Sequence, residues 1–433
     1  MGRRNVFVVG LDEAHRQHLE QVSAVREACE LHPVLSPCLL REWRCAPLQS
    51  LYERALESME RLGRPVDAIT GFGPFPVAPL VAMLCRHYGV PGPSLESVVA
   101  SEHRCWSRLL QGGEARANVL PLHTFDAFED HSLASFELEV PFVVRPVSRL
   151  AEHLSFRVAS ARDLEHALSR LREQLPAFVP AFEDLLAHVE LPAGLAAVDV
   201  GGCVAEPIVG GRRCRVEAHA FHGEVHSYGV VDLVPHPLEP TVARCEYPSR
   251  LPFPLQDDLK AIVGRVGRDF GFSNTAFRVE FVGDPVTQDV WVSEVDVGPA
   301  HVEAELFEMV DGRSGYAVAI DLALGRRPSF IHGRGRFGCA AKFMLRTVND
   351  AVVTRIPTAD ELERIRAKLP SAHIVVRAAA GDRRTRLPER VDDELDLAWI
   401  CIGGVDPERV HADYEACKPM LRFDFSDPHT RWH

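Results

Sequence analysis

The stretch FRVEFVGDPVTQDVWVSEVDVG, residues 277–298, decides the fold, because acidic and apolar residues alternate on both sides of a turn. The runs at 277–282 and 290–295 are β-branched and aromatic, and the Gly-Asp-Pro between them predicts a β-hairpin. A turn centred near Thr287 pairs Glu280 with Glu294. Because side chains alternate faces along a strand, Asp296 then shares a face with Glu294.

Three carboxylates on one patch of sheet repel one another, and burying them without partners is costly. Mg²⁺ removes that cost, because it takes oxygen ligands and often bridges carboxylates to substrate phosphates. The alternative is a solvated hairpin face whose acids pair with nearby arginines. The hairpin alone leaves both interpretations open.

Composition bounds the class of protein. A chain of 433 residues has room for two or three domains, and its 46% hydrophobic and 25% charged residues are ordinary for a globular protein. No apolar run of about 18 residues predicts a membrane span. A net charge of −13 argues against nucleic acid or an anionic membrane as the main partner. Eleven scattered cysteines without a CxxC pair favour reduced thiols in the cytoplasm.

The expected fold class is α/β with an α+β middle. Residues 1–120 alternate strand patterns with helix patterns, including one helix at 15–28, which predicts a doubly wound parallel sheet. Residues 121–325 carry antiparallel signals: two hairpin-like stretches (204–232 and 277–298), and a helix at 163–175 with Asp163 as its candidate cap. The tail, 326–433, carries short strands between two helices.

The order of these pieces resembles the ATP-grasp superfamily across essentially the whole chain. The resemblance is carried by VPGPSLESVVASEHRCWSRLL (90–110), PFVVRP (141–146), CVAEPIVGGRRCRVEA (203–218), the hairpin at 277–298 and LFEMVDGRSGYAVAIDLALG (306–325). It implies an ATP-grasp fold with an N-terminal domain (1–120), a two-sheet nucleotide-binding domain (121–325) and a C-terminal α+β domain (326–433). The last is similar to that of biotin carboxylase and the carboxylate–amine ligases.

The resemblance also implies a reaction. Such enzymes use ATP and Mg²⁺ to activate a carboxylate as an acylphosphate, which an amine then displaces. The implied partners are small-molecule carboxylate and amine substrates, with no nucleic acid or membrane, and a homodimer is possible. A thiol or hydroxyl acceptor stays open.

Residue roles carry over by matching position. Glu280, Glu294 and Asp296 match the metal ligands, with Asp296 where Asn is usual. Arg104 and Arg145 match the basic residues that face the phosphates, and the catalytic candidates are Arg145 and Arg313. The remaining nucleotide-binding candidates are Ser148, Arg149 and Ser155 in the phosphate loop and Glu206, Ile208 and Val209 in the adenine hinge.

Several positions depart from the family pattern. The loop at 148–155 has no glycine, Arg213 stands where a ribose-binding acid is usual, and arginine replaces lysine at the phosphate positions of a chain with only four lysines. The motif E-I-N-P-R reads EVDVG at 294–298, so its arginine is missing; Arg278, Arg313 and Arg346 are candidate substitutes. These departures favour the alternative function, a degenerate ATP-grasp protein with a non-catalytic binding or regulatory role.

Overall fold

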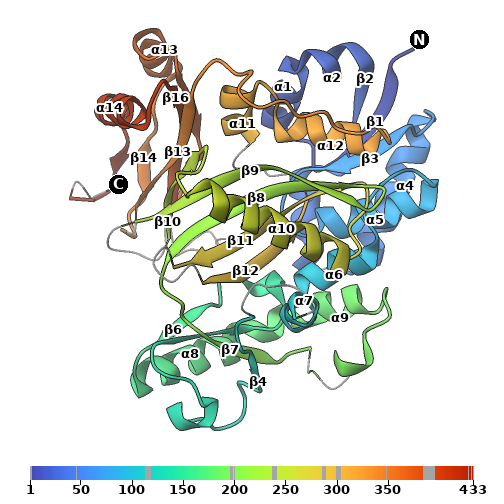
Figure 1. Ribbon diagram of the computed structural model, residues 1–433, viewed down its shortest axis with the longest axis vertical. Helices are drawn as coiled ribbons and strands as arrows, with labels where there is room; N and C mark the ends of the chain where they lie inside the picture. The colour runs from blue at the N-terminus through green and yellow to red at the C-terminus, as the bar shows by residue number, and fades with distance from the viewer. Residues whose placement is uncertain are drawn as a thin grey trace.

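The computed structural model describes the whole chain except residues 1, 45, 113–118, 196–197, 199, 237–240, 285–288, 299–303, 348, 384–394, 428, 431 and 433. The described residues form an N-terminal region, a small lobe below it and a large central sheet that continues into the C-terminal region (Figure 1). None of the helices that they form is long and apolar enough to cross a bilayer.

The N-terminal region confirms the predicted parallel sheet, in which β1 pairs in parallel with β2 on one side and β3 on the other. Its elements are β1 (Arg4–Val9), α1 (Glu13–Gln21), α2 (Ser23–Ala28), β2 (Cys29–Val34), α3 (Pro37–Leu40), α4 (Leu48–Leu62), β3 (Ala68–Gly71) and α5 (Val77–Tyr88). The single helix predicted at 15–28 is two helices, because Val22 has an extended backbone between them.

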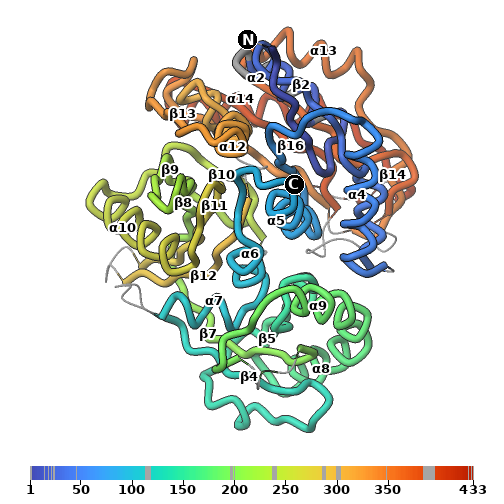
Figure 2. Tube along the Cα trace, turned by 90° about the vertical axis from the view of Figure 1, so that its right-hand side faces the viewer, coloured from blue at the N-terminus to red at the C-terminus, as the bar shows by residue number. Residues whose placement is uncertain are grey.

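The small lobe is a four-stranded antiparallel sheet in the order β4-β7-β5-β6, with α8 and α9 packed against it (Figures 1 and 2). Helices α6 (Leu95–Glu102) and α7 (Arg104–Gln111) lead into it, followed by β4 (His123–Phe125), β5 (Phe142–Pro146), the short helix η3 (Arg149–Ala151), β6 (Phe156–Val158), α8 (Ala161–Gln174), α9 (Val179–Leu186) and β7 (Cys203–Pro207). Ser160 caps α8, so the predicted cap Asp163 is wrong. Asp163 is the third residue of the helix, and its backbone N–H donates to the Ser160 hydroxyl.

The large sheet has the order β12-β11-β8-β9-β10-β13-β16-β15. Its strands are β8 (Arg212–Phe221), β9 (Glu224–Pro235), β10 (Val242–Tyr247), β11 (Thr275–Gly283), β12 (Val290–Val297), β13 (Cys339–Thr347), β15 (Ala372–Val376) and β16 (Leu395–Gly404). The remaining elements are α10 (Phe253–Asp269), α11 (Ala304–Asp311), α12 (Gly315–Ala323), β14 (Val353–Arg355), α13 (Ala359–Lys368), α14 (Pro407–Cys417) and β17 (Asp424–Phe425). This sheet takes strands from both sides of the domain boundary expected at 325/326.

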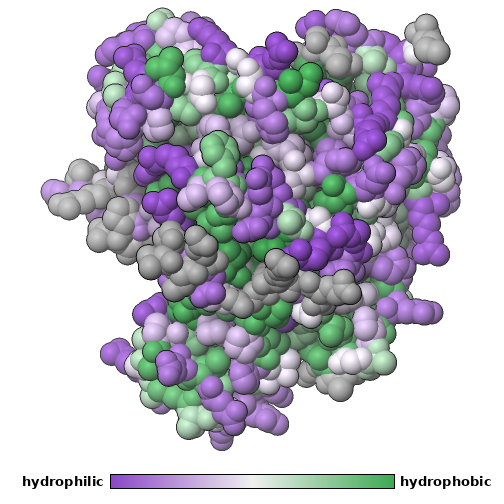
Figure 3. Space-filling view, in the orientation of Figure 1, coloured by the Kyte–Doolittle hydropathy of each residue, from purple (hydrophilic) through white to green (hydrophobic). Residues whose placement is uncertain are grey.

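Strand alternation divides the two faces of this sheet. On one face, Val216, Phe277 and Val279 pack with Val263 of α10 in a single apolar core. Side chains at the intervening positions, such as Arg278 and Glu280, consequently face the other way. Helices α11 and α12 cover one end of this second face through Leu306 and Val318. Figure 3 shows polar and apolar residues mixed over the small lobe and over the rest of this face of the molecule. The polar part of the second face of the sheet lies at the junction with the small lobe, where Glu294 binds Arg104 and Arg145.

Candidate active site

The acidic hairpin has the predicted register at its base. Glu280 pairs with Glu294, and Arg278 pairs with Asp296, between antiparallel strands β11 and β12. The register shifts by one residue beyond Glu280, where Phe281 pairs with Val292 and Ser293 is the extra residue of a β-bulge. The predicted turn centre, Thr287, lies outside the described residues. The shift occurs past the acidic positions, so the three carboxylates keep a common face.

The direct neighbours of these acids are arginine side chains. Seven guanidinium groups and six carboxyl groups lie together at the junction of the small lobe and the large sheet. We call this set the arginine–carboxylate network; its members are Arg104, Arg108, Arg145, Arg149, Arg213, Arg215, Arg278, Glu102, Glu152, Glu206, Glu280, Glu294 and Asp296. With every group ionised, the network carries one positive charge more than it carries negative charges.

Glu294 stands at the centre of the network. Its Oε1 accepts from Arg104 Nη1 at 3.5 Å and from Arg145 Nη1 at 3.4 Å, and its Oε2 accepts from Arg149 Nη2 at 3.4 Å. Burial opposes ionisation of this carboxyl, but the three arginines outweigh burial and hold the pKa of Glu294 well below its usual range. Glu294 is therefore ionised at neutral pH.

Asp296 binds arginines from both sides of the junction. Arg149 Nη2 lies 2.5 Å from one carboxylate oxygen, and Arg278 Nε donates to the other at 3.0 Å. Burial raises the pKa of Asp296, yet Arg149 and Arg278 lower it further than burial raises it. Asp296 thus links Arg149 of the small lobe to β11, the strand next to its own.

The other two predicted acids have arginine partners as well. Glu280 accepts from Arg215 Nε at 3.1 Å and from Arg213 Nη2 at 3.2 Å. Glu206, in β7, is 4% exposed and accepts from Arg145 Nε at 2.6 Å and from Arg108. Arg145 therefore spans the junction, with Glu206 of the small lobe on one side and Glu294 on the other.

Two carboxyl groups of the network have raised rather than lowered pKa values. Burial and the neighbouring Glu294 raise the pKa of Glu152 to about 7, against the opposing effect of Arg149 and Arg104. Burial also raises the pKa of Glu102, at the end of α6. When Glu152 binds a proton near neutral pH, the network has a further excess of positive charge.

Some guanidinium donors of the network are buried without an acceptor among the described residues. They are Nη2 of Arg104 and both Nε and Nη1 of Arg108. Arg104 is 6% exposed, and its Nη2 lies 3.9 Å from Glu152, beyond hydrogen-bond range. An unpaired buried donor costs about 1–3 kcal/mol, and an anion that reached it would remove that cost. Excess positive charge and orphaned donors together describe a site for a polyanion.

The carboxylates suit a hard cation by chemistry, because Mg²⁺ takes oxygen ligands and Glu280, Glu294 and Asp296 offer six oxygens on one face. In the described part of the chain, however, no three His, Cys, Asp or Glu side chains gather closely enough to hold a metal ion. Instead, each of the three acids has at least one arginine partner. These oxygens suit Mg²⁺ in type, and an anion that bound the arginines would leave the carboxylates available to the cation.

The remaining predicted residues lie in different surroundings. Ser148 is buried, and its hydroxyl accepts from Leu150 N. Ser155 is exposed and lines a separate depression with Arg157 and Arg162. Ile208, the residue after β7, is 41% exposed. Val209 beside it is half-buried.

The candidate substitutes for the missing arginine are also separated. Arg346 binds Asp396 and the Val242 carbonyl in the C-terminal part of the large sheet. Arg313 binds Asp321 of α12. Arg278 belongs to the network, and of the three candidates it is the one that lies on the acidic hairpin, where it binds Asp296.

Sequence reasoning missed Arg108, Arg215, Glu102 and Glu152 as members of the site. Arg108 follows Arg104 by four residues on α7, and Arg215 follows Arg213 by two on β8, so helical and strand periodicity could have placed each beside its neighbour. Glu102 and Glu152 carry no such signal, because only the tertiary fold brings both of them near Arg149.

We expect Glu152→Gln to flatten the pH dependence of stability. The pKa of Glu152 is raised by folding to about 7, so its contribution is fully present below the unfolded value of about 4.3 and is lost as pH rises to about 7. Between pH 5 and 7.5 the parent should lose about 1–3 kcal/mol relative to the variant, measured by urea unfolding. Parallel profiles would contradict the protonation state assigned to Glu152.

Comparison with known proteins gives one kind of match. No family model and no curated protein sequence matches this chain. Solved structures do match: the L-amino acid ligase from Bacillus licheniformis has a TM-score of 0.71 at 15% identity, covering 99% of this chain and 100% of that one. The biotin carboxylase domain of the 2-oxoglutarate carboxylase from Hydrogenobacter thermophilus, solved with MgADP, ADP and bicarbonate, has a TM-score of 0.67 at 14% identity.

That domain covers 100% of this chain and is itself covered over 92% of its length. Phosphoribosylglycinamide synthetase from Anaerococcus prevotii has a TM-score of 0.61 at 10% identity, over 98% of this chain and 100% of that one. At these identities the likeness establishes a shared fold along nearly the full chain.

Proposed function

Since the chain has the ATP-grasp fold along nearly its whole length, we propose that it is an ATP- and Mg²⁺-dependent ligase. It would activate a carboxylate as an acylphosphate and couple it to an amine. The observation that carries this proposal is the arginine–carboxylate network, which has surplus positive charge and orphaned buried donors at the junction of the two sheets. Several structures of the same fold were solved with ADP, and one of them with MgADP.

Binding of a nucleotide triphosphate would exchange partners within the network. Phosphate oxygens would take Arg104, Arg145 and Arg149, since a planar guanidinium binds phosphate as well as it binds carboxylate. Glu294 and Asp296, released from those arginines, would hold Mg²⁺ together with Glu280, whose own partners are Arg213 and Arg215. The cation would supply charge neutralisation for the transferring phosphoryl group. Opposite charges stay paired in this exchange, because the phosphates of MgATP pair with the arginines and its Mg²⁺ pairs with the carboxylates.

The residues of the chain then position two successive reactions. An oxygen of the substrate carboxylate attacks the γ-phosphorus, the bond between the γ-phosphorus and the β–γ bridging oxygen breaks, and ADP leaves. The amine nitrogen next attacks the acyl carbon, a C–N bond forms, phosphate leaves and the nitrogen loses a proton. Phosphoryl transfer asks mainly for positioning and charge stabilisation, which Arg145 and Arg149 supply. Glu206 fixes Arg145 from the opposite side.

Binding and turnover test the proposal in order. Calorimetry should detect MgATP binding at or below millimolar nucleotide. ADP and an amide product should then appear with some member of a panel of carboxylates and amines. Binding without ADP release from any carboxylate would overturn the ligase function, and no binding at millimolar MgATP would overturn nucleotide use altogether.

A second candidate function is a non-catalytic nucleotide-binding or regulatory role. One observation favours it: each predicted metal ligand already has an arginine partner, while Gly298 occupies the position of the family's arginine. The same experiment separates the two functions, because a regulatory protein binds nucleotide, or fails to, without releasing ADP under any pairing of substrates.

We also propose small-molecule carboxylate and amine substrates, cytoplasmic location and assembly as a homodimer. The ten described cysteines are all free, as expected for a reducing compartment. One of the similar structures is described as a dimer. Light scattering of the purified chain tests the assembly directly.

A further inference from the structure

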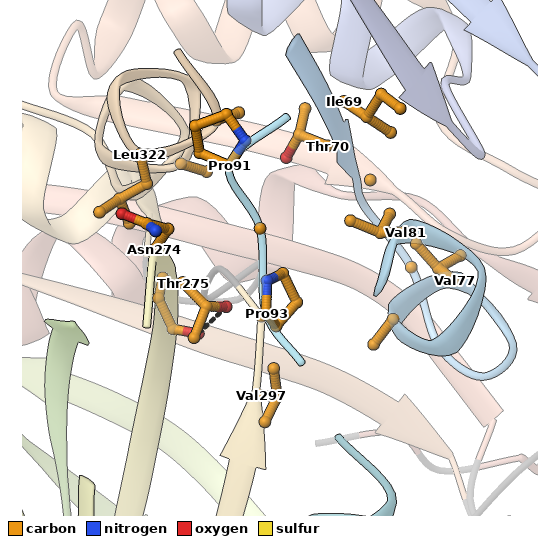
Figure 4. Close-up of a pocket in the computed structure, with 18 of the residues that line it drawn as sticks. Ile69, Thr70, Val77, Val81, Pro91, Pro93, Asn274, Thr275, Val297 and Leu322 are labelled. Carbon is orange, nitrogen blue, oxygen red and sulfur yellow. Dashed lines mark hydrogen bonds between the residues drawn. The ribbon is translucent and has the colours of Figure 1, made fainter. Parts of the chain in front are cut away.

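A cavity of about 90 Å³ lies between the N-terminal region and the large sheet, and Val297, the residue after Asp296, is part of its lining. Figure 4 shows Val77 and Val81 of α5 on one side of it, Thr275 and Leu322 on the other, and Pro91 with Pro93 between them. The cavity reaches Val297 and Gly298, the two residues that follow Asp296 along the chain. It therefore adjoins the acidic hairpin, which would hold the metal ion under the proposed function.

The lining of the cavity is mainly aliphatic and built by close packing. A Cβ at Gly71 would lie 2.4 Å from Val77 and 2.9 Å from Val81, so only glycine in β3 allows α5 to approach this closely. Val81 is 8% exposed, Leu322 is 1% exposed, and small residues such as Ala319 complete the wall. Such a surface favours an apolar group with few polar atoms.

Arg278 is the one charged residue among the described residues that line the cavity. Its Nε donates to Asp296 at 3.0 Å, and its side chain is 23% exposed. Arg278 therefore lines the cavity and also binds Asp296 of the acidic hairpin. A carboxylate held by Arg278 would lie next to the hairpin, with its substituent directed into the aliphatic wall.

Volume limits that substituent. A cavity of about 150 Å³ admits a benzene ring, whereas a liquid water occupies about 30 Å³. At about 90 Å³ the space matches a short aliphatic group and is smaller than a cavity that admits an aromatic ring.

From these observations we propose that the cavity binds the substituent of the carboxylate that becomes activated, and that Arg278 holds its carboxylate group. The substrate class is a small aliphatic carboxylic acid, with or without an α-amino group. This inference rests on the proposed ligase function. Arg278 thereby takes the place of the arginine that Gly298 replaces in the family motif.

The test measures kcat/KM for ADP release over a series of acids: acetate, propionate, isobutyrate and phenylpropionate, together with glycine, alanine, valine and phenylalanine. The parent should use the small members and show at least a 10-fold loss for the aromatic ones. Comparing alanine with propionate, and valine with isobutyrate, reveals whether the amino group is recognised.

Variants then relate the size limit to this wall. Val81→Ala should raise the preference for valine over alanine, or isobutyrate over propionate, by about 10-fold, because one methylene in a pocket is worth 10–200-fold. Ala78→Leu, which fills the wall, should lower it. Val410→Ala is the matched control, because it removes the same atoms from a buried residue of α14 in another core. Arg278→Gln should raise KM for the acid by at least 10-fold, with partial recovery in Arg278→Lys.

Each outcome bears on one proposal. Equal use of aromatic and small acids, or a Val81→Ala preference no different from that of Val410→Ala, overturns this inference and leaves the ligase function standing. The same holds if MgATP binds and no small aliphatic acid releases ADP while a larger acid does. Failure of MgATP to bind, scored separately by calorimetry, overturns both.

Discussion

Replacing Glu294 by alanine is expected to lower MgATP-dependent product formation by about 10²–10³-fold, the loss typical of removing one preorganised charge from a transition-state site. Glu294 contacts three arginines and lies opposite Glu280, so it is the acid most central to the proposed binding of metal and phosphates. The measurement is the single-turnover rate of ADP release at saturating Mg²⁺.

Binding of ATP in the absence of Mg²⁺ distinguishes a role of Glu294 in metal binding from a purely structural role. Alanine leaves Arg104, Arg145 and Arg149 without their shared carboxylate, so metal-free ATP should bind the variant at least as tightly as it binds the parent. Addition of Mg²⁺ should then strengthen binding less than in the parent. Weaker metal-free binding in a folded variant would contradict the partner exchange.

Glu246→Ala is the matched control. Glu246 also holds two arginines, Arg244 and Arg250, and its side chain is 15% exposed against 18% for Glu294, but it lies on β10 outside the network. Its turnover should equal that of the parent. A loss in Glu246→Ala as large as that in Glu294→Ala would show that the effect is one of folding.

The hairpin was predictable because strand period and register depend on local pattern. Alternation in 277–282 and 290–295 was enough to pair Glu280 with Glu294, and the strand-helix alternation before residue 120 was enough to predict the parallel sheet. The bulge at Ser293 was not predictable, because one extra residue changes no polarity pattern near the turn.

The partners of the acids were beyond sequence reasoning. Arg104, Arg145 and Arg149 come from α7, β5 and η3, which converge on Glu294 only through the packing of the small lobe on the large sheet. Residue type gave the chemistry of each position, since arginine and carboxylate are the groups that bind phosphate and metal. Their pairing with one another depends on distances that no spacing along the chain encodes.

A second cluster of ionisable groups joins α11 to the C-terminal part of the large sheet. Glu305 of α11 lies 3.6 Å from Lys342 Nζ, accepts from the Cys401 thiol at 2.7 Å and lies 3.1 Å from His373 Nδ1. Lys342, one of four lysines in the chain, is 1% exposed, and its ammonium lies 4.1 Å from the centre of the Trp399 ring. The ammonium therefore depends on Glu305 for its counter-charge.

Glu305→Gln is expected to lower the free energy of unfolding by about 3–5 kcal/mol at pH 7, because it leaves the Lys342 charge buried without a partner. Burial opposes ionisation of Glu305, but His373 and Lys342 outweigh it and hold its pKa at about 2. The stabilisation is therefore present above the unfolded value of about 4.3 and is lost as pH falls through about 2. Urea unfolding of the parent and the variant at pH 7 and at pH 3 measures the loss of stability and its decrease at low pH.

Two further variants decide whether the cost comes from the unpaired charge. Glu305→Leu combined with Lys342→Met removes both charges and should recover most of the loss, since an apolar replacement of a buried pair is often neutral or stabilising. Glu246→Gln, with the same 15% exposure but with arginine partners nearer the surface, should cost less than about 1 kcal/mol. A double variant as unstable as Glu305→Gln would place the cost in lost packing, and a single variant within about 1 kcal/mol of the parent would show that Lys342 has no need of Glu305.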